Sequence, residues 1–419
     1  MRKLVIASPV ATQSGYGHHA REIISQLIEQ RGSEWDVKLV SLPWGHTPFT
    51  YPLSNDLKSR IIPLPLTEQP DIWIQVTIPN EFQPVGKFNI GITAGTEGDL
   101  CPEGWIDDLN KMQLVIVPSE FTKQVFEHTA KEKNKTITTK IHVVPEYFDE
   151  TVYTGKYELN LDVLDTIPES WAFLTVGHWL QGSLGEDRKN ISGVIYSFYD
   201  AYKNQKNQPA LVLKTSGATY SVTDRMEIEK KIKQVASIFK KTDRLPKVYL
   251  LHGELSDAEM NALYMHPKIK AMYSLTKSEG FGRPLLEFAT TSKPIIAPYF
   301  SGPADFLKQD FICEVKGGLT NVHPTAQNDW LIGEAKWFTP DYKYAVDCLR
   351  NVQKDYKKWL ELAKRQRFFA RSNFNKNAVT KIYADIFKQI DTALESVPKP
   401  IALKLPSLSK IELPKLQKV

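Results

Sequence analysis

The sequence predicts an α/β protein with two doubly wound domains, each a parallel sheet covered by helices on both faces. Three observations lead to this prediction. Short β-rich apolar runs alternate with amphipathic helical stretches from one end of the chain to the other. The 419 residues exceed the roughly 250–300 that one hydrophobic core accommodates. Continuous apolar runs such as LVIVP and KPIIAP suit strands buried on both faces.

The candidate strands form two series with a polar junction between them. The first series is Lys3–Ser8, Asp36–Leu42, Asp71–Val76, Phe88–Thr93, Leu114–Pro118 and Lys140–Val144. The second is Trp171–Val176, Leu211–Lys214, Lys247–Leu251, Ile269–Leu275, Pro294–Ala297 and Phe311–Glu314. The stretch Tyr153–Ser170 contains Gly155 and Pro168 and has no strong periodicity. We therefore expect one domain over residues 1–155 and a second over 170–372.

Capping residues and apolar spacing indicate several helices. Ser119 is the expected N-cap of EFTKQVFEH, and Ser256 with Glu259 forms a capping box before MNALY. Near the end of the chain, apolar residues at helical spacing predict one buried stripe, made of Val379, Ile382, Tyr383, Ile386, Phe387 and Ile390. This last long helix is expected within residues 373–395.

The segment Ser396–Val419 differs from the rest of the chain. It contains four prolines, five lysines and one glutamate. Prolines at this density prevent a regular helix, so an extended tail is expected. Leucines alternating with lysines leave open a second interpretation, an arm that binds a partner or an anionic surface.

Composition indicates a soluble cytoplasmic protein. No apolar run approaches the roughly 18–20 residues of a transmembrane helix, and Leu4–Ala7 is too short for the core of a signal peptide. Cys101, Cys313 and Cys348 lie far apart in the sequence, show no metal-binding spacing and suit a reducing compartment. The net charge of +5 permits an anionic ligand but does not argue for nucleic acid.

The most informative segment is KSEGFGRPLLEFATTSKPIIAPYFSGPADFL. Glu279 and Glu287 stand eight positions apart, with Gly280, Gly282 and then Pro284 between them. A Gly-x-Gly turn lets the backbone approach a ligand closely, and proline suits the first turn of a helix. Isolated carboxylates would repel a phosphate but accept hydrogen bonds from vicinal sugar hydroxyls. The pattern indicates a site for a sugar-containing ligand, whereas the two glutamates alone would also fit an ordinary loop-to-helix turn.

This segment resembles the motif of glutamate, seven residues, glutamate in retaining glycosyltransferases with the GT-B fold. The match includes the strand KPIIAP and the turn SGPADFL. The resemblance implies that Glu279 contacts the donor sugar and that Glu287 binds the ribose hydroxyls. It also implies that the amides of Gly280, Phe281 and Gly282 contact sugar and phosphate.

A second segment, TVGHWLQGSLGEDRKNISGVIYSFYDAY, resembles the start of the family's donor domain, where a basic pair steadies the donor diphosphate. Arg188 and Lys189 take that position here, and together they can neutralise phosphate oxygens. The family usually has an arginine directly after the glycine of this strand, whereas here His178 follows. Either His178 makes a weaker contact or Arg188 covers the role alone. Lys214, at the end of ALVLK, is a further candidate for phosphate contact.

Two segments of the first half are candidates for the same cleft. Gly15 and Gly17 follow the first strand and resemble the glycine-rich loop of the family, which closes on the donor. His18 and its neighbour His19 either line the cleft or lie on a helix surface. Glu97, in NIGITAGTEGDL, stands in the region where many family members place a histidine, so it is a candidate on the acceptor side together with His18.

The resemblance extends through about Leu394 and implies a GT-B architecture with its active site between the domains. The donor would lie on the second domain and the acceptor on the first, and the last helix would cross back to the first domain. The implied reaction retains the anomeric configuration and needs no metal or cofactor besides the nucleotide-sugar co-substrate. Arg188, Lys189 and the loop amides would stabilise the leaving diphosphate.

Several alternatives remain open from the sequence. The acceptor could be a glycan, a lipid-linked sugar, a protein or a modified DNA base. The last is included because GHWL, GEDRKN and KSEGFGRPLLEF look similar to glycosyltransferases of bacteriophages, some of whose relatives decorate DNA bases. A sugar-nucleotide epimerase and a non-catalytic nucleotide-binding relative would share the fold.

Overall fold

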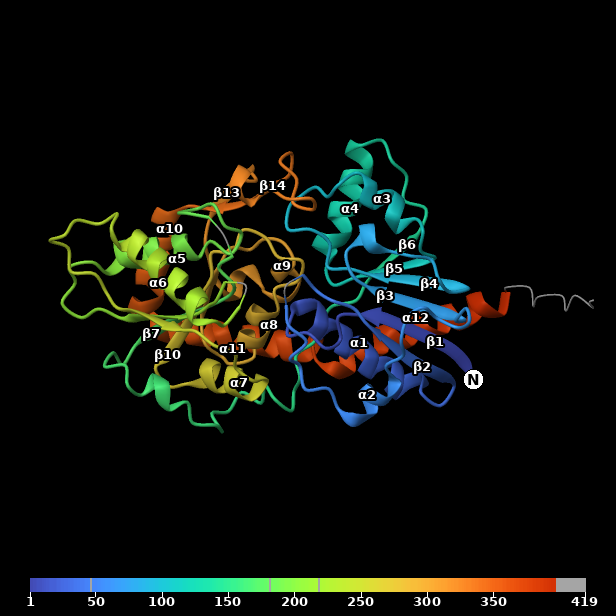
Figure 1. Ribbon diagram of the computed structural model, residues 1–419. Coiled ribbons are helices and arrows are strands. Elements are labelled where there is room, and N and C mark those ends of the chain that lie inside the picture. Colours follow the sequence, from blue (N-terminus) through green and yellow to red (C-terminus); the bar gives the residue numbers. More distant parts are fainter. Residues whose placement is uncertain (46, 181, 218, 397–419) are drawn as a thin grey trace, which may run out of the picture.

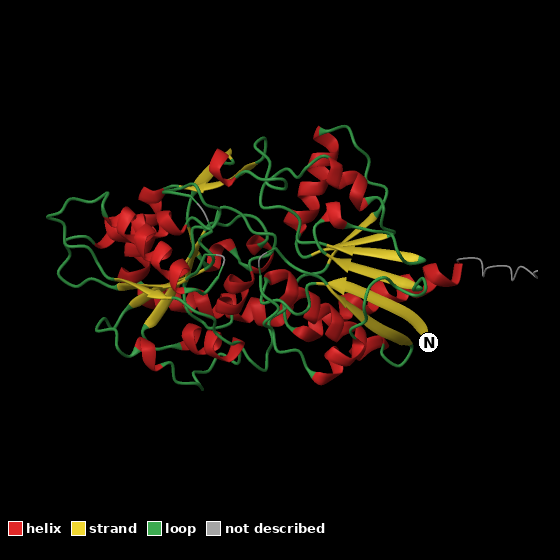
Figure 2. Ribbon diagram, in the orientation of Figure 1, coloured by secondary structure: helices red, strands yellow, loops and turns green. Residues whose placement is uncertain are grey.

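The computed structural model describes residues 1–396 except 46, 181 and 218. Within these residues, two six-stranded parallel sheets lie in the two halves of an elongated molecule (Figure 1). Helices cover both faces of each sheet (Figure 2). The predicted fold class is therefore confirmed. None of the helices in this described part combines the length and apolar character that a membrane crossing requires.

The first sheet has the order β2-β1-β3-β4-β5-β6. Its strands are β1 (Arg2–Ser8), β2 (Trp35–Ser41), β3 (Ile72–Val76), β4 (Phe88–Ile92), β5 (Leu114–Val117) and β6 (Lys140–Val143). The helices of this half are α1 (Gly15–Arg31), α2 (Asn55–Arg60), α3 (Gly104–Leu109) and α4 (Glu120–Glu132).

The second sheet has the order β12-β11-β10-β7-β8-β9. Its strands are β7 (Ala172–Val176), β8 (Ala210–Lys214), β9 (Val248–Leu251), β10 (Ile269–Tyr273), β11 (Ile295–Ala297) and β12 (Cys313–Glu314). Its helices are α5 (Ile191–Tyr202), α6 (Val222–Ala236), α7 (Asp257–Met265), α8 (Arg283–Ala289), α9 (Pro303–Phe306), α10 (Tyr342–Lys354) and α11 (Tyr356–Asn373). The strand order reverses between β7 and β10, which creates a crevice beyond their carboxyl ends.

Each predicted strand is present with both ends within two residues of the expected positions. The two capping predictions are also confirmed: the Ser119 hydroxyl accepts from the amide of Thr122, and Ser256 and Glu259 form a capping box. Cys313 and Cys348, distant in the sequence, lie close enough for the Cys313 thiol to approach the Cys348 carbonyl at 3.9 Å. All three cysteines are free and buried.

The last helix, α12 (Lys376–Ser396), starts at the second half and lies along the first sheet (Figure 1). Its buried side chains join the core of that sheet; the Phe387 ring meets Trp35 with 5.7 Å between centroids. Ile382, predicted to belong to the stripe, is 36% exposed because it lies at the edge of this face. Of the predicted tail, Ser396–Val419, only Ser396 is among the described residues, where it ends α12.

A hairpin that the sequence did not predict joins the two halves. Strands β13 (Gly317–Asn321) and β14 (Lys336–Pro340) pair antiparallel, and we call residues 317–340 the bridging hairpin. The Asp99 amide donates to the Lys336 carbonyl at 2.9 Å, and the Lys336 amide donates to the Asp99 carboxylate at 2.6 Å. The Thr96 hydroxyl donates to the Trp330 carbonyl at 2.9 Å. The second half thus holds the loop that follows β4.

Candidate active site

The candidate site lies at the carboxyl ends of β7 and β10, where the strand order of the second sheet reverses. Arg188 and Lys189 follow β7, and Glu279 follows β10. The loop after β4, which carries Glu97, faces them from the first half. Strand topology therefore brings together residues that the sequence placed in separate motifs.

Glu279 is the most heavily contacted acid of this site. Its carboxylate accepts from Arg188 Nη1 at 2.7 Å and from the Thr276 hydroxyl at 2.7 Å, and it pairs with Lys189 Nζ at 2.5 Å. Its amide donates to the Ser301 hydroxyl at 3.0 Å. Burial acts to raise the pKa of Glu279, but Lys189 and Arg188 outweigh burial and lower the pKa to about 2. Glu279 is therefore a fixed anion at neutral pH.

Arg188 connects this acid to the first half of the chain. Its Nη2 atom lies 3.3 Å from the carboxylate of Glu97, and Nη1 also donates to the Ser278 carbonyl at 3.0 Å. Burial lowers the pKa of Lys189, and the neighbouring Glu279 acts against that shift. Two cations and two carboxylates thus form one partly buried network between the halves, and a bound anion could pair with Arg188 and Lys189.

His178 and Lys214 lie at the rim of the same network. His178 Nδ1 is 3.2 Å from the Ser216 hydroxyl, and Lys214 Nζ donates to the Gly253 carbonyl at 2.7 Å. Burial, with the positive charges of Lys189 and Lys214, lowers the pKa of His178 to about 4. A neutral imidazole adds no charge for a phosphate, so His178 can offer only a hydrogen bond there.

Glu287 lies in α8, and both oxygens of its carboxylate accept a hydrogen bond. Arg283 Nε donates to Oε1 at 2.9 Å, and the Tyr264 hydroxyl donates to Oε2 at 3.0 Å. Burial raises the pKa of Glu287, and Arg283 opposes that shift. Each oxygen retains a second lone pair that could accept from a ligand hydroxyl.

Gly15 and Gly17 lie in the first turn of α1, after the N-cap Ser14, and not in the expected loop before a helix; one of the two has a steric reason to be a glycine. A Cβ on Gly17 would lie 2.4 Å from the Thr12 carbonyl oxygen, whereas one on Gly15 would meet nothing within 4 Å. In the same helix, His18 and His19 each have a buried Nε2 atom without a hydrogen-bond partner among the described residues. Burial, with Arg283, lowers the pKa of both rings, to about 4 for His19.

The GFG turn between the two glutamates touches the first half through its backbone. The Gly280 carbonyl accepts from the Ser119 hydroxyl at 2.6 Å. The Phe281 ring is buried against Phe306, with 5.1 Å between centroids, so only its backbone can serve a ligand. Gly282 adopts a φ of 97°, which a glycine reaches without strain.

We expect Gly280→Ala to push the two halves apart. A Cβ at this position would lie 2.4 Å from the Ala94 carbonyl oxygen across the interface. The expected cost is about 1–3 kcal/mol of unfolding free energy, as for other overpacked sites. Thermal denaturation measures it, with Gly318→Ala as the control because a Cβ there meets nothing within 4 Å. Equal midpoints for the two variants would contradict the close approach.

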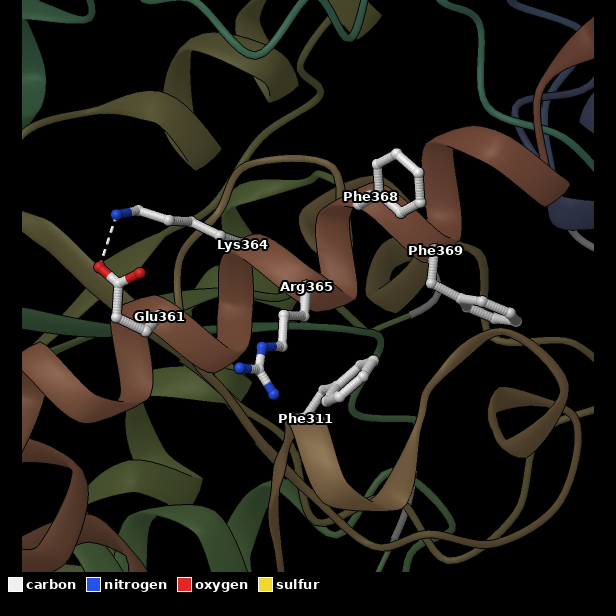
Figure 3. Close-up of a pocket in the computed structure, with 6 residues that line it drawn as sticks. All are labelled: Phe311, Glu361, Lys364, Arg365, Phe368 and Phe369. Atoms are coloured by element: carbon white, nitrogen blue, oxygen red, sulfur yellow. Dashed lines mark hydrogen bonds and ion pairs between the residues drawn. The ribbon is translucent and has the colours of Figure 1, made fainter.

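Metal-binding groups and surface grooves are the remaining features to consider. Within the described residues, no group of three or more His, Cys, Asp or Glu side chains is placed to hold a metal ion. A surface groove of about 460 Å³ lies away from the network, along α11 (Figure 3). It is lined by Phe311, Glu361, Lys364, Arg365, Phe368 and Phe369. None of these six was predicted as a site residue.

Comparison with known proteins bears on the fold. No protein-family model and no curated protein sequence matches the chain. Sucrose-phosphate synthase from Thermosynechococcus elongatus superposes over 94% of this chain and 100% of its own, with a TM-score of 0.60 at 12% identity. HepE from Anabaena, solved with UDP and glucose, covers 93% and 100%, with a TM-score of 0.61 at 13% identity.

The UDP-forming α,α-trehalose-phosphate synthase from Burkholderia xenovorans gives the same result. It covers 93% of this chain and 99% of its own, with a TM-score of 0.61 at 11% identity. The chain has the GT-B fold. The similarity includes both sheets because it extends over more than nine-tenths of the chain in each comparison. In GT-B terms, the network of Glu279, Arg188, Lys189 and Glu97 lies between the two domains.

Proposed function

We propose that this protein is a glycosyltransferase that moves a sugar from a nucleoside-diphosphate sugar to an acceptor and retains the anomeric configuration. The observation that carries the proposal is the direct contact of Glu279 with Arg188 and Lys189 at the strand-order reversal of a GT-B sheet. Arg188 and Glu279 are 91 positions apart in the sequence. The proposal assigns this acid to the sugar and the two cations to the diphosphate.

The proposed donor site uses these charges in turn. The donor diphosphate would share Arg188 and Lys189 with Glu279, which frees part of the Glu279 carboxylate to accept from a sugar hydroxyl. When the bond between the anomeric carbon and the diphosphate oxygen breaks, positive charge develops on the sugar and negative charge on the diphosphate. Glu279 stabilises the first charge, and Arg188 with Lys189 stabilises the second.

The acceptor would approach from the first domain, where Glu97 contacts Arg188. Its oxygen forms the new bond to the anomeric carbon on the face that the diphosphate leaves. The acceptor proton passes to a phosphate oxygen of the departing nucleotide, so the balance requires no protein nucleophile. UDP-sugars are the first donors to test, because HepE, which shares the fold, was solved with UDP-glucose.

A thermal-shift screen tests the proposal. Nucleoside diphosphates should stabilise the protein more than the matching monophosphates, since Arg188 and Lys189 are assigned to the diphosphate. A ligand at 100 times its Kd adds about 2.7 kcal/mol of stability. Product analysis by NMR then reads the anomeric configuration. If the product is an epimerised nucleotide sugar, the activity is epimerisation and not transfer. Donor binding without turnover would indicate a non-catalytic relative.

Glu287→Ala should weaken the donor and the free nucleotide by a similar factor, because the ribose does not react. The expected loss is about 1.5–3 kcal/mol of binding free energy, as for one hydrogen bond to a charged group. Isothermal titration of the ribose and 2′-deoxyribose nucleotides measures it, and the 2′-deoxy form should lose less. Glu361→Ala, which removes an exposed acid of α11, is the control. Unchanged nucleotide affinity in Glu287→Ala would remove this residue from the ribose site.

A further inference from the structure

Arg283 lies inside the segment EGFGRPLLE, where the sequence pattern alone indicates no role for it. Its guanidinium contacts three carboxylates from different parts of the chain. Nε donates to Glu287 at 2.9 Å, one turn further along α8. Nη1 donates to Glu22 of α1 at 2.5 Å and to Glu146, which follows β6, at 3.2 Å. Arg283 therefore connects the proposed ribose-binding acid to the first domain.

The whole cluster is removed from solvent. The side chains of Arg283, Glu22, Glu146 and Glu287 are 12%, 9%, 8% and 8% exposed. Buried charges have a large desolvation cost, so each depends on its partners. The three acids hold Arg283 in its charged form, and Arg283 is the one cation that contacts Glu287 among the described residues.

The contacts of Arg283 with the first domain and its contact with Glu287 depend on each other. A guanidinium is planar and rigid, so the contacts of Nη1 with the first domain fix the direction in which Nε points. Glu287 is then held in one orientation, with Tyr264 on its other oxygen. A lysine would supply the charge at this position but could not direct two hydrogen bonds in this fixed arrangement.

We propose that Arg283 is a positioning residue that couples recognition of the donor ribose by Glu287 to contact between the two domains. This inference rests on the proposed function. With the domains in contact, Glu22 and Glu146 hold Arg283, and Arg283 orients Glu287 toward the ribose. Because the coupling is reciprocal, a bound ribonucleotide also stabilises the contact between the domains.

The experiment compares binding of a nucleoside diphosphate with its 2′-deoxy analogue by isothermal titration. UDP, ADP and GDP are tried first on the wild type, and the tightest is used with all variants. The wild type should favour the ribose form by about tenfold or more, the equivalent of one charged hydrogen bond. Arg283→Met and Arg283→Lys should both reduce this preference to about one.

The decisive variant is Glu22→Ala/Glu146→Ala, because neither residue contacts Glu287. Its preference for the ribose form should also fall, by a factor of about five or more from the tenfold preference of the wild type. Lys133→Ala is the matched control, since it removes an exposed ion pair with Glu334 that also joins the two halves. Its ribose preference should equal that of the wild type. Circular dichroism confirms that each variant is folded.

Each outcome has a separate meaning. A ribose preference that survives in the Glu22/Glu146 variant overturns the coupling, because Arg283 would then act within the second domain alone. A preference that survives in Arg283→Lys overturns the positioning role, because charge alone would suffice. If the wild type binds no nucleoside diphosphate, the proposed function fails and this inference fails with it.

Discussion

Glu279→Gln should lower kcat by about 100-fold, which corresponds to roughly 2.7 kcal/mol of transition-state stabilisation. Glutamine keeps the shape of the side chain and can still meet Thr276, but it removes the negative charge that, in the proposed transfer, stabilises the positive charge developing on the sugar. Affinity for the nucleoside diphosphate should not fall, because Arg188 and Lys189 lose a competing anion. Steady-state kinetics and titration with the nucleotide measure the two effects separately.

Glu361→Gln, a change at an exposed acid in the groove of α11, should leave both quantities unaltered. If Glu279→Gln retained wild-type turnover, Glu279 would not act on the reacting sugar. If nucleotide affinity fell in parallel with kcat, the residue would instead belong to ground-state binding of the nucleotide.

Replacing Arg188 and Lys189 together with alanine should lower the free energy of unfolding by about 3–5 kcal/mol at neutral pH. Glu279 would then remain buried without either counter-charge. Adding Glu279→Gln to the double variant should recover a large part of the loss, because the uncompensated charge disappears. Urea denaturation of the three variants measures the effect, and binding of nucleoside diphosphate should be lost in the double variant.

The loss of unfolding free energy in the double variant should become smaller as the pH falls. The folded-state pKa of Glu279 lies at about 2, below its ordinary value of 4.5. The network therefore stabilises the fold fully above pH 4.5, and that contribution disappears as the pH falls toward 2. The difference between wild type and double variant should shrink over the same range.

Lys133→Ala/Lys135→Ala removes two exposed cations and should change stability by less than about 0.5 kcal/mol. A double variant at positions 188 and 189 as stable as this control would mean that the network does not support the fold.

Much of the fold was predictable because buried parallel strands are apolar along their whole length. LVIVP became β5 and KPIIAP contains β11, each buried on both faces. The bridging hairpin has the opposite character: all residues of β13 are exposed, and two of them are glycines. No apolar pattern marks such a strand, and its pairing with β14 depends on contacts that the sequence does not display.

The candidate site was predictable at the level of residue types but not of contacts. Glu279 and the Arg188–Lys189 pair were assigned from their motifs to different parts of the donor, and their direct ion pairs were not expected. Arg283 and Glu22 are 261 positions apart, so only the folded structure shows that their side chains meet. Phe281 was considered for its backbone, and the burial of its ring requires knowledge of the core.

The bridging hairpin also restricts how the two domains can move. It fastens the loop after β4 on one side of the molecule, while α12 passes between the domains on the other side (Figure 1). Separating the two domains on the side of the hairpin would break the hydrogen bonds of Asp99 with Lys336 and of Thr96 with Trp330.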